Sequence, residues 1–215
     1  MKTVLMMCML AVMQSACLSN KNNSGSEDLA SNPPVDAAQA KADYIQQLQE
    51  RYGAAIAVEQ QQVPLSCEDD GVSGYFSKRI VGGQTVLLRY GRGGDHGGFT
   101  WRVLLEQGSV LLIRKESSGW SFDNGSDIDY NNSTTSHTID SFYEESFYFQ
   151  GGELVDAFSQ GAVARSFLKE TISQKKAEAV SEAIQNPDPT EVLKITQMMI
   201  DAAPEGADTS PLCDF

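Results

Sequence analysis

Phe99-Thr100-Trp101-Arg102-Val103-Leu104-Leu105-Glu106-Gln107-Gly108-Ser109-Val110 is the stretch of sequence that decides the fold. Successive side chains of a β-strand point to opposite faces of a sheet. One face of this strand would carry Phe99, Trp101, Val103 and Leu105, and the other would carry Thr100, Leu104, Arg102 and Glu106. Gln107-Gly108 suits the positive φ angles of a two-residue hairpin turn. The stretch therefore predicts two antiparallel strands, with Leu104 as the one apolar residue on the polar face.

Two further turns centred on glycine repeat this pattern on either side. Gly82-Gly83 and Gly151-Gly152 each separate two apolar runs. We therefore expect an antiparallel meander of about six strands in three hairpins, between residues 74 and 158. The fifth strand is rich in aromatic residues, which we assign to the core rather than to a binding face; they are Phe142, Tyr143, Phe147, Tyr148 and Phe149.

A helix is predicted before the sheet, because residues 37–52 carry apolar side chains at three-to-four spacing and Gly53 follows them. Two more helices are predicted after the sheet. The first contains the apolar residues Phe167, Leu168, Ile172, Val180 and Ile184. The second begins at Asp188-Pro189 and ends before Pro204.

These elements predict an α+β fold, in which amphipathic helices cover a sheet. We expect one domain over residues 36–215, with the helices of 164–203 as a candidate sub-lobe. The preceding residues, 17–35, are rich in Asn, Ser, Gly and charged side chains, a composition typical of a flexible tether.

The N-terminus begins with Met1 and Lys2, continues with about ten residues without charge, and reaches Ala16-Cys17. The apolar run is about half as long as a membrane-spanning helix requires. This segment resembles the signal of a bacterial lipoprotein. The resemblance implies cleavage after residue 16, fatty acylation of Cys17 with chains such as palmitate, and outer-membrane sorting, because Leu18 rather than Asp follows. The alternative is an ordinary cleaved signal.

The remaining cysteines support export. Cys8 would leave with the signal and Cys17 would carry lipid, so Cys67 and Cys213 remain as a pair. In an oxidising compartment an even remainder suggests one disulfide, which would join the start of the folded domain to its C-terminal tail. Two separate thiols are the alternative.

The charge of the chain excludes a nucleic-acid partner. Removal of residues 1–16 leaves 15 basic and 29 acidic residues, a formal charge of −14. Such a surface is repelled by phosphate backbones and gains nothing from anionic lipids. Membrane attachment would therefore depend on acyl chains, of which two or more hold stably.

Two segments are candidate sites. The glycine-rich segment 91–98 is expected to be a long hairpin connection, and it contains the weak ligand-loop candidates Arg92, Asp95 and His96. The polar segment 120–137 contains the weak metal-ligand candidates Asp123, Asp127 and Asp129. A calcium loop that began at Asp127 would have Thr138 where the bidentate Glu belongs, so we expect neither a metal nor another cofactor.

The sequence contains no catalytic motif, and we expect a binding or assembly module that meets another component of the cell envelope. Its oligomeric state stays open. Two alternatives remain. Ser73-Gly74-Tyr75 resembles part of a motif of lipoproteins that inhibit lysozyme, which implies an inhibitor of an envelope-directed enzyme. Asp95, Glu144 and Glu145 are the acids that a hydrolase of envelope polymers would use.

Overall fold

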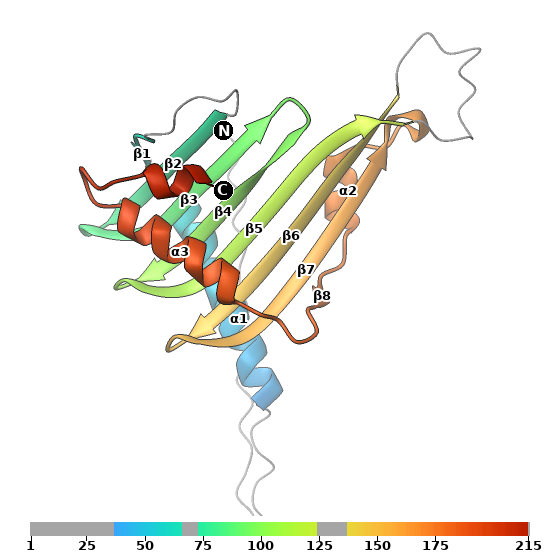
Figure 1. Cartoon of the computed structure of the whole chain (residues 1–215). Helices are drawn as coiled ribbons and strands as arrows, with labels where there is room; N and C mark the ends of the chain where they lie inside the picture. Colours follow the sequence, from blue (N-terminus) through green and yellow to red (C-terminus); the bar gives the residue numbers. More distant parts are fainter. Residues whose placement is uncertain (1–36, 66–72, 124–136, 215) are drawn as a thin grey trace, which may run out of the picture. The chain divides into compact units, whose positions relative to one another are not determined.

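The hairpin at Gln107-Gly108 lies at the middle of the sheet in a computed structural model of the chain, which describes residues 37–65, 73–123 and 137–214. Each strand pairs antiparallel with the next one along the chain (Figure 1). The strands are β1 (Gln60–Val63), β2 (Ser73–Val81), β3 (Gln84–Gly94), β4 (Gly97–Glu106), β5 (Ser109–Phe122), β6 (Thr138–Gln150), β7 (Glu153–Arg165) and β8 (Glu182–Ala183). The helices are α1 (Ala37–Ile56), η1 (Ser166–Leu168), α2 (Ile172–Glu178), α3 (Thr190–Ala202) and η2 (Ser210–Asp214).

The α+β class, the meander order and the three tight turns are confirmed. Both central residues of each turn have positive φ, for example 59° at Gly151 and 88° at Gly152, as a type I′ turn requires. The predicted number of strands was too low. The described residues form eight strands, because β1 and β8 are short strands that add to the two edges of the sheet.

The expected long connection at residues 91–98 was wrong. Gly91–Gly94 belongs to β3 and Gly97 begins β4, so Asp95 and His96 alone form the turn. A side chain at position 97 would bring a Cβ within 2.3 Å of the Ser118 carbonyl oxygen of β5, and Gly97 has φ of +148°. Glycine therefore allows this hairpin to continue to its tip while β5 lies alongside it.

The helix boundaries differ from prediction in two places. Helix α1 continues past Gly53 to Ile56. The apolar pattern of 167–184 does not form one helix. It is divided into η1, α2 and β8, because Lys169 takes a left-handed conformation and Thr171 begins a new helix by accepting a hydrogen bond from the Gln174 N–H.

The two faces of the sheet are covered by different helices. On one face, the α3 face, Trp101, Val103 and Leu105 are buried together with Ile195 and Met199 of α3. On the other face, the α1 face, Leu104 and Leu112 are buried with Leu48 and Tyr52 of α1. Figure 1 shows α3 in front of the sheet and α1 behind it. Leu104, which interrupts the polar alternation, is therefore the residue on which α1 packs.

Helix α3 has well-defined ends. Asp188 accepts a hydrogen bond from the Thr190 N–H at 3.0 Å, and the pKa of Asp188 is lowered by its hydrogen bonds from Thr190. At the other end, the Lys78 ammonium donates to the Ala203 carbonyl oxygen at 2.7 Å. A cation at this end also complements the helix dipole. Because α3 shares the main core of the sheet, it belongs to the sheet domain.

The C-terminal tail is fixed beside the end of β1. Thr209 donates a hydrogen bond to the Pro64 carbonyl oxygen at 3.2 Å, and the side chains of Tyr90 and Arg92 donate to the carbonyl oxygens of Leu212 and Cys213. Cys67 lies outside the described residues, so its disulfide with Cys213 stays a prediction. Within the described residues, no helix is long and apolar enough to cross a membrane.

Candidate functional site

Three arginines lie side by side across the α1 face, and we call them the arginine row: Arg89, Arg102 and Arg114. Arg89 of β3 is directly opposite Arg102 of β4, which is directly opposite Arg114 of β5. All three side chains are half-buried. Like charges directly opposite each other destabilise a sheet, and a half-buried charge loses part of its hydration. A row of this kind in an acidic protein therefore needs an explanation beyond folding.

The members of the row differ in their partners. Arg102 forms an ion pair with Glu116 at 3.2 Å. Arg114 lies over the ring of Tyr52, 4.4 Å from its centroid, and Arg89 lies 4.7 Å from the ring centroid of Tyr75. Among the described residues neither Arg89 nor Arg114 forms an ion pair. The buried Nε atoms of both have no hydrogen-bond partner in the part of the chain that the structure describes.

An acidic row follows the arginine row on the same face. Glu116 of β5 is directly opposite Glu144 of β6. Besides Arg102, the ammonium of Lys176 in α2 lies 3.9 Å from Glu116. Glu144 accepts a hydrogen bond from Gln160 at 3.2 Å. The α1 face thus carries positive and negative groups on successive rows of the sheet.

Burial and neighbouring groups together set the protonation of Tyr52 and Arg102. Desolvation raises the pKa of Tyr52, whereas the nearby Arg102 and Arg114 lower it by less. The hydroxyl of Tyr52 is therefore neutral at physiological pH. Burial lowers the pKa of Arg102, and the adjacent Tyr52 and Glu116 raise it by more in total, so the guanidinium stays charged.

A pocket of about 420 Å³ opens beside Arg114, between α1 and the segment that leads into β8. Its charged lining residues are Arg114 and Glu144. Neutral polar lining comes from Gln49, Ser146, Tyr148, Ser159, Gln160 and Ser181, and the rest from Ile45, Tyr52 and Phe158. This volume is within the range of small-molecule sites, which combine apolar walls with a few polar groups. We call it the α1-face pocket.

No family model, curated protein or solved structure matches this chain. The function is therefore inferred from the geometry of the site.

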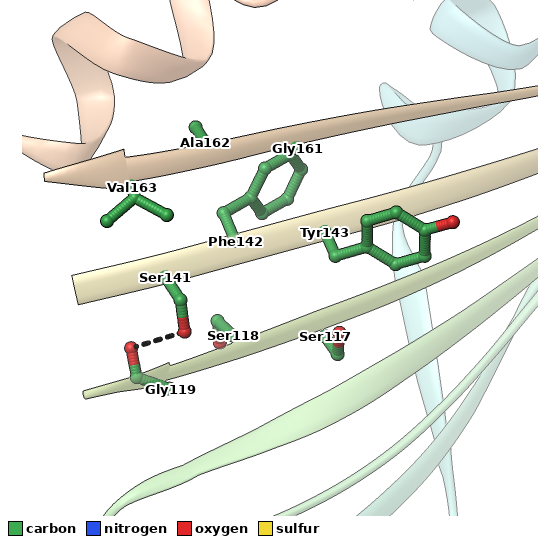
Figure 2. A pocket seen from close by; sticks show the side chains of 9 residues that line it. All are labelled: Ser117, Ser118, Gly119, Ser141, Phe142, Tyr143, Gly161, Ala162 and Val163. Carbon is green, nitrogen blue, oxygen red and sulfur yellow. Dashed lines mark hydrogen bonds between the residues drawn. The ribbon is translucent and has the colours of Figure 1, made fainter. Parts of the chain in front are cut away.

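A second hollow, of about 490 Å³, lies on β5, β6 and β7 where several small residues come together (Figure 2). Ser141 donates a hydrogen bond to the Gly119 carbonyl oxygen at its floor. Tyr143 and Val163 are 45% and 55% exposed beside it. None of its lining residues is charged. Because this hollow has no charged group to orient a small ligand, we place the candidate site at the α1-face pocket.

The structure separates the residues of the predicted ligand loop. Arg92 is a strand residue that donates to the C-terminal tail. Asp95 and His96 are exposed at the hairpin turn, where the Asp95 carbonyl oxygen accepts a hydrogen bond from the indole of Trp120 at 2.8 Å. The ring of His96 lies 4.5 Å from that of Trp120. These contacts give Asp95 and His96 a role in fixing the hairpin tip against β5.

Asp123 occupies a structural position. It is 2% exposed, and both of its carboxylate oxygens accept hydrogen bonds from Arg165, at 2.8 and 2.9 Å. Asp127 and Asp129 lie outside the described residues, so the metal-site hypothesis as a whole stays untested. Within the described residues, no three His, Cys, Asp or Glu side chains form a group that could hold a metal ion.

The acids considered for a hydrolase are also separated. Glu144 points to the α1 face, whereas Glu145 points to the α3 face and lies 3.6 Å from Lys115. Tyr75 of the Ser73-Gly74-Tyr75 motif lies within β2, where its hydroxyl is hydrogen-bonded to Thr100 at 2.7 Å. No motif in the sequence marks Arg89, Arg114 or Glu116 as site residues. For Arg102, the alternating pattern predicts only a position on the polar face of its strand.

Proposed function

We propose that this chain is an exported, lipid-anchored protein of the cell envelope that binds a small carboxylate ligand on its α1 face and catalyses no reaction on it. The proposal of export rests on the N-terminal segment and on Cys17, which lie outside the described residues. The proposal of ligand binding rests on one observation: Arg114 lines a pocket of about 420 Å³, and its buried Nε has no hydrogen-bond partner among the described residues.

The chemistry of the row favours a carboxylate. Guanidinium groups bind carboxylates and phosphates through paired N–H donors. Glu116 and Glu144 form the adjacent row and repel a second negative charge. A monoanion is therefore favoured over a phosphate dianion. The formal charge of −14 after removal of residues 1–16 also repels polyanions at long range, and the pocket volume of about 420 Å³ limits the site to small ligands.

Calorimetric titration of the purified domain tests this function. The probes are L-leucine and 4-methylpentanoate, two carboxylates of similar size. We expect saturable 1:1 binding of at least one probe and a loss of affinity of tenfold or more in Arg114→Gln. Lys115→Gln is the matched control, because it removes one positive charge from the neighbouring residue on the opposite face. No saturable binding, or an equal loss in the control, would contradict the proposal.

A further inference from the structure

The α1-face pocket contains a second charged group that a simple carboxylate would not use. Arg114 of β5 is directly opposite Ser146 of β6, and Glu144 is two residues from Ser146 on the same face. Arg114 and Glu144 are therefore diagonal neighbours across one strand pair, a geometry in which long side chains reach each other. Both line the α1-face pocket.

These two opposite charges nevertheless do not pair. The described ion pairs include none between Arg114 and Glu144. Arg114 lies on the Tyr52 ring instead, and Glu144 accepts its hydrogen bond from the neutral Gln160. Among the described residues, the pocket is thus lined by one cation and one anion that do not pair with each other.

We infer that the pocket binds a small zwitterion, an α-amino acid with an aliphatic side chain, whose carboxylate contacts Arg114 and whose ammonium contacts Glu144. This inference rests on the proposed carboxylate binding and adds the second charge to it. A zwitterion satisfies both groups at once, whereas a carboxylate alone leaves Glu144 facing a negative ligand.

The remaining lining residues fit this ligand class. Ile45 of α1 and Phe158 of β7 supply apolar walls for an aliphatic side chain. Gln49 and Tyr148 are hydrogen-bonded to each other at 3.2 Å at the α1 side of the pocket. Ser181 contacts Gln160 at 3.5 Å at the opposite side. Apart from Arg114 and Glu144, the polar lining of the pocket is therefore uncharged.

The test compares two ligands that differ in the amino group alone. L-Leucine and 4-methylpentanoate carry the same aliphatic chain and carboxylate, and only leucine carries an ammonium. We expect leucine to bind at least tenfold more tightly than 4-methylpentanoate to the wild-type domain. In Glu144→Gln the affinity for leucine should fall at least tenfold, while the affinity for 4-methylpentanoate stays the same or rises.

Glu145→Gln is the matched control, because Glu145 lies on the opposite face, and it should leave both affinities within twofold of wild type. Equal affinity for the two probes, or a Glu144→Gln variant that binds leucine as wild type does, would overturn the inference and leave the carboxylate function standing. Failure of both probes to bind would overturn both. Circular dichroism of each variant establishes that it is folded.

Discussion

The arginine row places three guanidinium groups in register, although fewer charges would give a more stable sheet. Arg102 has a carboxylate partner in Glu116, whereas Arg114 forms no ion pair with a described residue and lies over the ring of Tyr52. The stabilisation from such a cation–π contact is about 0.5–2 kcal/mol. It offsets part of the repulsion from Arg102 and part of the lost hydration. Arg114 therefore contributes little net stability to the fold, which is expected of a residue that serves ligand binding rather than folding.

Arg114→Met tests whether the residue serves binding rather than folding. We expect the free energy of unfolding to change by no more than about 1 kcal/mol, because methionine fills similar space and removes a repulsive charge. The comparison is Arg165→Met, which should lower the free energy of unfolding by about 3 kcal/mol, since it removes the guanidinium that pairs with the buried carboxylate of Asp123. Urea unfolding measures both. A loss in Arg114→Met as large as that in Arg165→Met would show that Arg114 is structural.

The register that creates the row could not be predicted from the sequence. A regular hairpin with its turn at Gln107-Gly108 would pair Arg102 with Ile113. The observed ladder shifts by one residue between Leu104 and Leu105, and this bulge brings Arg114 opposite Arg102. A single inserted residue moves every later side chain to the other face. The hydrophobic pattern predicts the two strands, but it does not predict the one-residue shift in their register.

At the scale of elements, local signals correctly predicted the tight turns, α3 and most of α1, but they did not predict the division of residues 167–184 into η1, α2 and β8. Tight turns, α1 and α3 each follow from a short pattern of glycine, capping residues or apolar spacing. Strand β8 has two residues and exists because it pairs with Phe158 and Ser159 of β7. Its sequence, Glu182-Ala183, has no strand signal of its own.

The β3–β4 hairpin provides a prediction at this scale. Gly97→Ala should lower the free energy of unfolding by about 1–3 kcal/mol, because the new Cβ would meet the backbone of β5 and the φ angle disfavours alanine. Gly53→Ala is the opposite case. Gly53 lies exposed within α1 and has open space around its Cα. Because glycine is unfavourable in the middle of a helix, alanine at this position should raise the free energy of unfolding by about 0.5–1 kcal/mol.

Tryptophan fluorescence during urea unfolding follows both variants, since Trp120 lies against the hairpin tip. Unchanged stability in Gly97→Ala would show that the hairpin does not need this glycine, and a destabilised Gly53→Ala would argue against the helical position of Gly53.

At the scale of the whole molecule, residues 37–215 form a compact unit of their own. Its fold and its ligand site should therefore not depend on the proposed anchor. Cys17→Ser should move the protein from the outer-membrane fraction to the soluble periplasmic fraction, while the affinity for L-leucine stays within twofold of wild type. Fractionation and calorimetry measure the two results. A Cys17→Ser variant that stays in the membrane fraction would contradict acylation at Cys17.

The proposed disulfide is consistent with the position of the tail. Thr209 contacts Pro64, so the segments that precede Cys213 and Cys67 lie side by side. The sequence suggested this pairing from cysteine number alone, and the contact brings the two segments together independently of any sulfur.

The most direct test of the account is an NMR measurement of the arginine Nε–H resonances during titration with L-leucine. We expect the Arg114 resonance to shift with a saturable dependence on ligand concentration, because its Nε has no hydrogen-bond partner among the described residues. The Arg165 resonance should stay in place, because its Nε already donates to Asp123. The result that would contradict ligand binding is that neither resonance moves, or that the Arg114 and Arg165 resonances shift together in proportion to added L-leucine without saturation.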